Sequence, residues 1–205
     1  MMFPASKSAG PVRWFLIGMS ALLLALSIYR GFGAFVTLPI ERAAGLVERG
    51  QAISLAGLER IITRFGDTDT APLATAALYR FMSRLGPEAN RAATRAQAEK
   101  HLATGLALRP VTGAGWLSLA RLRHLRGAPG EITASALELS YLVSPVAPER
   151  ALDRLGLAQE LSAFLSSEGQ ASARQEARLA KRHPKTAAGF VALVARFPSI
   201  ARWAE

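Results

Sequence analysis

The sequence predicts an all-α protein, in which one transmembrane helix precedes an array of antiparallel helical hairpins. Three observations lead to this fold class. Half of the 205 residues are apolar, and Ala, Leu and Arg dominate over the β-branched residues that favour strands. Gly and Pro interrupt the apolar pattern at fairly regular intervals. The apolar content excludes a largely disordered chain, and the absence of Cys excludes disulfides, thiolate nucleophiles and Cys-ligated metal centres.

The first helix is predicted by sixteen uncharged residues, 14–29, which lie between Arg13 and Arg30. A helix needs about 20 residues to cross the hydrocarbon layer of a membrane, and flanking arginines can lengthen the span by reaching to the two interfaces. An aromatic residue also stands at each end of the run, where such rings favour the headgroup region. The segment therefore predicts a transmembrane helix over 12–30.

Basic residues indicate the orientation of this helix, because Lys7 and Arg13 precede it and only Arg30 follows it directly. The predicted organisation is a cytoplasmic amino terminus (1–11), a transmembrane helix (12–30), a linker (31–39) and a periplasmic domain (40–205). The predicted location is therefore the bacterial inner membrane, with a single pass. The alternative is a secretory signal cleaved near Ser27, which would release a secreted binding protein.

Helical periodicity runs through the rest of the chain, and no sustained strand-like alternation stands out. Pro39 and Gly50 predict a short helix over 40–49, because Pro favours a helix start and Gly a helix end. Later boundaries predict helices over 52–65, 88–108 and 113–126, and helices that end before Gly86, Pro145, Gly169, Pro184 and Pro198. One hairpin cannot bury its apolar face alone, so we expect neighbouring hairpins to stack.

The most specific pattern lies within 98–145, where small and large residues recur at the spacing of helical hairpins. Its members are Ala98, Leu102, Gly105, Pro110, Trp116, Leu119, Ala120 and Leu139. This pattern resembles the tetratricopeptide repeat, W-x2-L-G-x2-Y followed by A-x3-F and then P. Leu102 stands where the repeat has Phe, and Ala120 where it has Gly. In the second unit the A-x3-F pair falls on Ile132 and Ala136, with large and small exchanged.

A broader resemblance covers about 85–204, which has a helix ending in L-x-L-x-P, a Trp-led hairpin, a Ser-Pro turn and a terminal helix with Pro198. These features resemble small membrane-anchored helical-repeat proteins associated with bacterial envelope polysaccharide synthesis. The resemblance implies a periplasmic scaffold or adaptor that binds protein partners in an envelope assembly.

Catalytic and metal-binding motifs are not found in the sequence. His101, His124 and His183 lie far apart and lack the H-x-x-x-H spacing of a local metal site. The sequence therefore predicts no catalytic residue, no metal and no cofactor. The alternative is an envelope-acting enzyme whose site draws carboxylates from separate helices. Glu149 and Asp153 could also be interpreted as a carboxylate pair, but nearby arginines, such as Arg150 three residues before Asp153, predict ion pairs on a solvated helix surface.

Positive charge is the remaining functional signal, since the net charge is +10. Arg121, Arg123, His124 and Arg126 end one helix, where the helix dipole favours them. The second concentration consists of Arg174, Arg178, Lys181, Arg182 and Lys185. These five residues predict contact with protein partners, anionic lipid or acidic polysaccharide, with a solvated face as the alternative. Nucleic acid is not an expected partner in the predicted periplasmic location.

Overall fold

The computed structural model describes residues 9–49, 51, 53–65 and 71–205, and these residues form helices and loops without a strand. The helices are α1 (Ala9–Glu48), α2 (Leu55–Phe65), α3 (Pro72–Leu85), α4 (Glu88–Leu108), α5 (Gly113–Leu125), α6 (Gly130–Val143), α7 (Pro148–Glu160), α8 (Ser167–Arg182), α9 (Ala187–Arg196) and α10 (Ser199–Trp203). The all-α prediction is confirmed.

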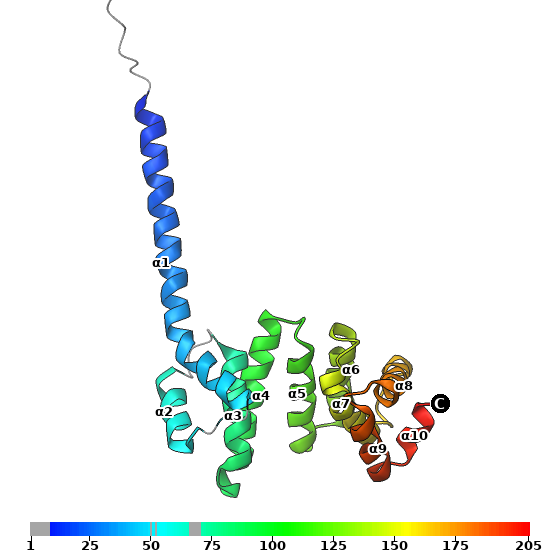
Figure 1. Cartoon of the computed structure of the whole chain (residues 1–205). Helices are drawn as coiled ribbons and strands as arrows, with labels where there is room; N and C mark the ends of the chain where they lie inside the picture. Colours follow the sequence, from blue (N-terminus) through cyan, green and yellow to red (C-terminus); the bar gives the residue numbers. More distant parts are fainter. Residues whose placement is uncertain (1–8, 50, 52, 66–70) are drawn as a thin grey trace, which may run out of the picture.

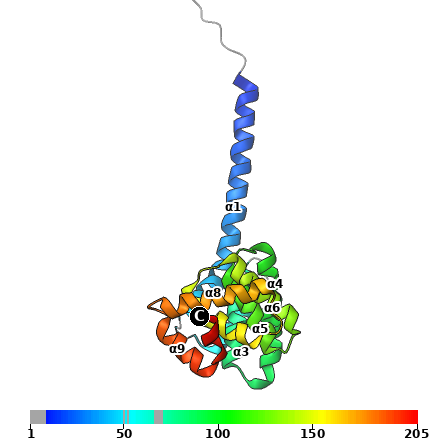
Figure 2. The same ribbon diagram turned by 90° about the vertical axis from the view of Figure 1, so that its right-hand side faces the viewer.

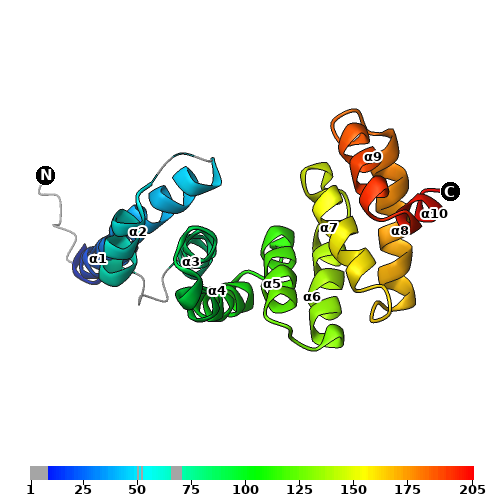
Figure 3. The same ribbon diagram turned by 90° about the horizontal axis from the view of Figure 1, so that it is seen from below.

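Successive helices pack as hairpins, namely α3 with α4, α5 with α6 and α7 with α8. Figure 3 shows them following one another along the array, with α9 and α10 at its end. Short turns make this arrangement possible. Gly127 has a φ of 69°, in the left-handed region that favours glycine, and the amide of Ala128 donates to the carbonyl of Arg123 at 3.0 Å. These features end α5 and return the chain into α6, so the predicted repeat-like helical fold is confirmed.

The apolar core runs through the array in three neighbouring clusters. The central cluster joins α3 to α8, and a second joins α7 to α10. The third places Ile40, Ala43 and Ala44 of α1 against Leu58 of α2 and Leu78 of α3. This last cluster attaches the carboxyl-terminal part of α1 to the array.

The separate helix expected over 40–49 is wrong, because α1 continues without interruption through Pro39 to Glu48. Proline inside a helix removes one hydrogen bond and costs about 3 kcal/mol. The turn that follows Pro39 buries Ile40 completely and Ala43 to 3% exposure, and this apolar burial offsets the cost. The segment 31–39, expected to be a linker, accordingly lies within α1.

The transmembrane helix expected over 12–30 is also wrong, and with it the predicted single-pass location in the inner membrane. Within the described part of the chain, no helix combines the length and the apolar character that crossing a membrane requires. The uncharged run between Arg13 and Arg30 has sixteen residues, which is below the about 20 needed for a span. This part of α1 projects from the array (Figures 1 and 2). Residues 1–8 of the expected cytoplasmic terminus lie outside the described residues.

The residues that carry the repeat resemblance lie on α4, α5 and α6 and in the turn between α4 and α5. Those that are buried are Ala98, Leu102, Gly105, Leu119 and Ala120, whereas Trp116 and Leu139 are partly buried and Pro110 is exposed. A Cβ atom on Gly105 would lie 2.5 Å from Leu73 Cδ2, so glycine permits the close approach of α3 and α4. The indole nitrogen of Trp116 donates to the carbonyl of Pro110 at 2.7 Å and ties α5 to the turn before it.

Candidate functional site

A groove of about 570 Å³ lies across α3, α4, α5, α7 and the end of α9. Its polar lining is dominated by six arginines, which are Arg80, Arg84, Arg91, Arg95, Arg121 and Arg196. Its apolar lining includes Leu122, Leu152, Leu157, Leu193 and Phe197. We call this site the arginine groove, and its apolar residues the floor. The hairpin packing therefore gathers charges from helices that are distant in the sequence.

The wall formed by α3 and α4 carries two pairs of arginines, each pair four residues apart: Arg80 and Arg84 on α3, and Arg91 and Arg95 on α4. Arg80 Nη1 donates to the hydroxyl of Ser118 at 2.5 Å, and Arg91 Nε donates to the carbonyl of Gly86 at 3.3 Å. The other two arginines form no ion pair with a carboxylate of the described residues. Arg84, Arg91 and Arg95 thus present positive charge on this wall without an ion-pair partner among the described residues.

The opposite wall is compensated by two carboxylates of α7. Asp153 Oδ1 lies 2.7 Å from Arg121 Nη2. Glu160 Oε2 lies 3.0 Å from His124 Nε2, and its other oxygen lies 3.8 Å from Arg196 Nη2. Asp153 therefore pairs with another helix, and the surface pair with Arg150 expected from the sequence is not the contact seen. Each of the two carboxylates of the groove lining is therefore paired with basic side chains that also line the groove.

The chemistry of the groove suits an anionic ligand. Six arginines face two carboxylates in its lining, so the local charge is strongly positive. A guanidinium group offers several planar donors that match carboxylate or phosphate oxygens in a bidentate arrangement. Gly156 also lines the groove, and a Cβ atom there would lie 3.7 Å from Leu193 Cδ1, which is ordinary contact. A side chain could therefore be added at Gly156 to fill the groove without a clash in the core.

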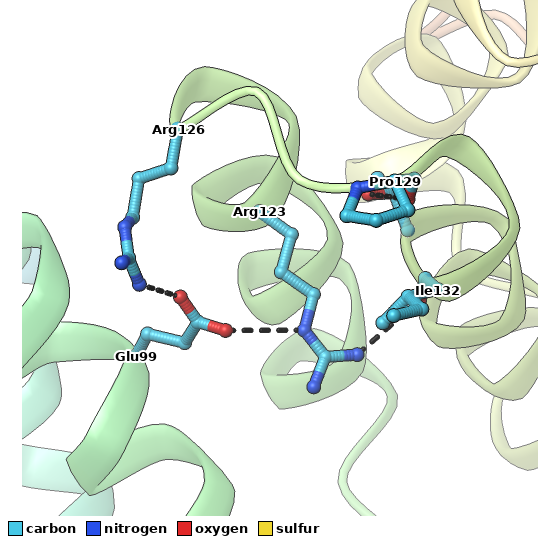
Figure 4. A network of polar contacts seen from close by, with 6 residues as sticks. Glu99, Arg123, Arg126, Pro129 and Ile132 are labelled. Atoms are coloured by element: carbon cyan, nitrogen blue, oxygen red, sulfur yellow. Dashed lines mark hydrogen bonds and ion pairs between the residues drawn. The ribbon is translucent and has the colours of Figure 1, made fainter.

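The basic end of α5 serves to join helices, as Figure 4 shows. Arg123 Nε lies 3.2 Å from Glu99 Oε1 of α4, and Arg126 forms an ion pair with the other oxygen of the same carboxylate. Arg123 Nη1 also donates to the carbonyl of Ile132 on α6 at 3.2 Å. The helix-dipole interpretation missed these contacts, because Glu99 lies 24 residues or more before either arginine.

The α8 stripe lies apart from the arginine groove, and it consists of the five basic residues Arg174, Arg178, Lys181, Arg182 and Lys185. All five of its residues are exposed, and none of them lines the groove. The buried residues of α8 occupy the other side of the helix, among them Ala173, Ala177 and Ala180. Four of the five residues lie on α8 and Lys185 follows the end of that helix, and the proposed contacts of the stripe with partners, lipid or polysaccharide stay a prediction.

A second arginine site is buried where α6, α7 and α8 meet. Arg154 is 1% exposed and forms an ion pair with Glu176, which is 4% exposed. Arg154 Nη1 also donates to the carbonyls of Ser140 at 3.1 Å and Ser144 at 2.7 Å, and its guanidinium lies 4.7 Å from the centre of the Tyr141 ring. We call this group the buried junction. Its contacts secure the end of α6 to α7 and α8.

Burial determines the proton affinity of the buried junction. It raises the pKa of Glu176 to about 7, and the neighbouring Arg154 opposes this shift by stabilising the carboxylate. Burial also raises the pKa of Tyr141 well above its ordinary value, and the nearby Glu176 carboxylate adds to that increase. The carboxyl of Glu176 therefore gains or loses its proton near neutral pH.

The three histidines do not converge on a common site. His101 is buried and stacks on Tyr79 at 5.5 Å, His124 pairs with Glu160 in the groove, and His183 follows α8. Among the described residues, no group of three or more His, Asp or Glu side chains could hold a metal ion.

One sequence signal could have located the arginine groove. The spacing R-x3-R occurs on both sides of the Gly86-Pro87 turn, and folding that turn into a hairpin places the two pairs side by side. The buried junction had no such signal, because an isolated Arg on a helix has the appearance of a surface residue. Comparisons of the chain with known protein families, curated proteins and solved structures find no match.

Proposed function

We propose that the chain is a helical repeat-like adaptor that binds a partner protein through the arginine groove. One observation carries the proposal: Arg84, Arg91 and Arg95 form no ion pair with a carboxylate of the described residues, while the two carboxylates of the groove lining are paired on the opposite wall. Stacked helical hairpins commonly expose extended surfaces of this kind for binding.

The arrangement is not explained by stability. Like charges four residues apart on a helix destabilise it by about 0.2–0.5 kcal/mol, and both α3 and α4 carry such a pair. The ion pairs of Arg123 and Arg126 with Glu99 show the contrasting case, in which neighbouring helices supply the missing acid. Positive charge kept without compensation in a groove is typical of a binding surface.

A binding role is favoured over the enzyme alternative. A pair of catalytic carboxylates needs free oxygen atoms that face the substrate, but Asp153 contacts Arg121, and Glu160 contacts His124 and Arg196. Glu149 does not form a free carboxylate pair with Asp153 either, because Glu149 contacts Arg150 at 2.9 Å. A role in envelope polysaccharide synthesis stays a prediction from the resemblance alone.

Photocrosslinking tests the adaptor proposal in cells that produce the protein. A photoreactive benzoylphenylalanine replaces Leu125, which lines the groove and is 59% exposed. The matched control carries the same group at Val111, which is 79% exposed and outside the groove. We expect a protein adduct from position 125 that position 111 does not give. The adduct should disappear in the Arg84→Glu/Arg95→Glu background. An adduct that forms equally at positions 125 and 111, and that persists in the double variant, would contradict the proposal.

A further inference from the structure

We infer that the ligand of the arginine groove is an acidic amphipathic peptide segment, whose carboxylates face α3 and α4 and whose apolar side chains cover the floor. The inference rests on the proposed function and specifies the chemistry of the partner. It follows from three properties of the groove: the spacing of the arginines, the apolar floor and the paired acids of the opposite wall.

The arginine spacing suits a peptide. Residues four apart on a helix are separated by about 6 Å along its axis, so the two arginines of each pair leave the backbone of α3 or α4 at about this interval. Acidic residues one turn apart on a helix, or two residues apart on an extended strand, repeat at a similar distance. A peptide with periodic carboxylates can therefore meet several guanidinium groups at once, each in a bidentate arrangement.

The floor requires an apolar component in the ligand. Leu122 and Leu157 are buried in the core at its base, while Leu152, Leu193 and Phe197 are partly exposed to the groove. A small inorganic anion or a purely polar polyanion would leave this surface in water. Apolar side chains on one face of a peptide would remove it from water and gain hydrophobic stabilisation. The volume of about 570 Å³ accommodates a few side chains, as in grooves that bind a helix or a strand.

The opposite wall sets the orientation of the ligand. Asp153 and Glu160 would repel an anion placed against α7, and displacing Arg121 or Arg196 from them would break an existing ion pair. The acidic face of the peptide is therefore directed toward Arg84 and its neighbours on α3 and α4. A ligand that is anionic on all sides is disfavoured by the same groups.

The test uses a phage-displayed library of random twelve-residue peptides, selected on the immobilised full-length protein. Enriched sequences should combine several Asp or Glu residues with Leu, Ile or Phe at intervals that place them on opposite faces. Synthetic peptides of these sequences should bind the Arg84→Glu/Arg95→Glu variant at least tenfold more weakly than the natural protein, because two attractive contacts become repulsive. Gly156→Leu should cause a comparable loss by filling the groove, with no change in net charge.

The matched control is Arg174→Glu/Arg178→Glu, which changes the net charge by the same amount on the α8 stripe. Its affinity should stay within twofold of the natural protein. Replacing Asp and Glu of the peptide by Asn and Gln, or its apolar residues by Ser, should each abolish measurable binding. Circular dichroism of every protein variant checks that the fold is retained.

Three outcomes would overturn the inference. They are enrichment of peptides that lack acids or lack apolar residues, equal losses of peptide affinity in the groove and control variants, and undiminished binding after the apolar residues become Ser.

The photocrosslinking experiment separates the two proposals. A protein adduct at position 125 together with no acidic amphipathic enrichment would reject the peptide class and keep the adaptor function. Enrichment without any protein adduct in cells would reject the adaptor function and keep the ligand chemistry of the groove.

Discussion

Two regions of the molecule use arginine in opposite ways. In the buried junction, Arg154 is 1% exposed and contacts a carboxylate, two carbonyls and an aromatic ring. In the arginine groove, Arg84 is exposed, Arg95 is partly exposed, and both lack an acidic partner among the described residues. The difference teaches that the surroundings, rather than the residue type, decide whether a charge stabilises the fold or is available to a ligand.

The largest expected effect is the loss of stability when the buried junction is broken. Arg154→Leu should lower the free energy of unfolding by about 3–5 kcal/mol near pH 8, because the buried Glu176 would lose its ion-pair partner and two backbone carbonyls would lose their donor. Urea denaturation followed by circular dichroism measures this change. The double variant Arg154→Leu/Glu176→Leu should recover much of the loss, and a double variant no more stable than the single one would contradict this account.

The second prediction concerns the pH dependence of stability. The pKa of Glu176 is about 7 in the folded chain, above the ordinary value of 4.5, so between about pH 5 and pH 7 the folded state keeps a proton that the unfolded state releases. Stability from this group is present below about pH 4.5 and declines as pH rises to about 7. The decline should amount to about 1–3 kcal/mol. Glu176→Gln should remove it, and parallel pH profiles for the two proteins would show that another group is responsible.

In the groove we expect a change in binding with little change in stability. Arg84→Glu/Arg95→Glu should leave the free energy of unfolding within about 0.5 kcal/mol, because neither arginine forms an ion pair in the described part of the chain. Recovery of the crosslinked partner should fall at least tenfold. Destabilisation by more than about 2 kcal/mol would show that these arginines stabilise the fold as Arg154 does. The proposed difference between the arginine groove and the buried junction would then be wrong.

The smallest effect is expected on the α8 stripe. Charge reversal of Arg174, Arg178 and Arg182 should leave folding intact, since all three side chains are exposed. If the groove is the binding surface, partner recovery in a pull-down should change less than twofold. A tenfold loss of partner recovery would instead support the stripe as a partner surface. The partner would then have to contact both the arginine groove and the α8 stripe.

Much of the local structure could be predicted from the sequence. The positions of Gly and Pro predicted the ends of several helices, including the end of α3 before Gly86 and the end of α6 before Pro145. The exposure of the α8 stripe also agrees with its spacing, because residues four apart share one side of a helix. These features depend on interactions between near neighbours in the chain, which is the range over which periodicity and capping act.

Tertiary packing decided the remaining features. Packing allows α1 to continue as a helix beyond Pro39, since burial of Ile40 against α2 and α3 outweighs the hydrogen bond that proline removes. It also paired Arg154 with Glu176, 22 residues away, and brought arginines from four helices into one groove. The sequence by itself determined helices and their exposed charges. Which charges became paired, buried or gathered was decided only when helices distant in the chain came into contact, because charge interactions depend on distance and burial in space.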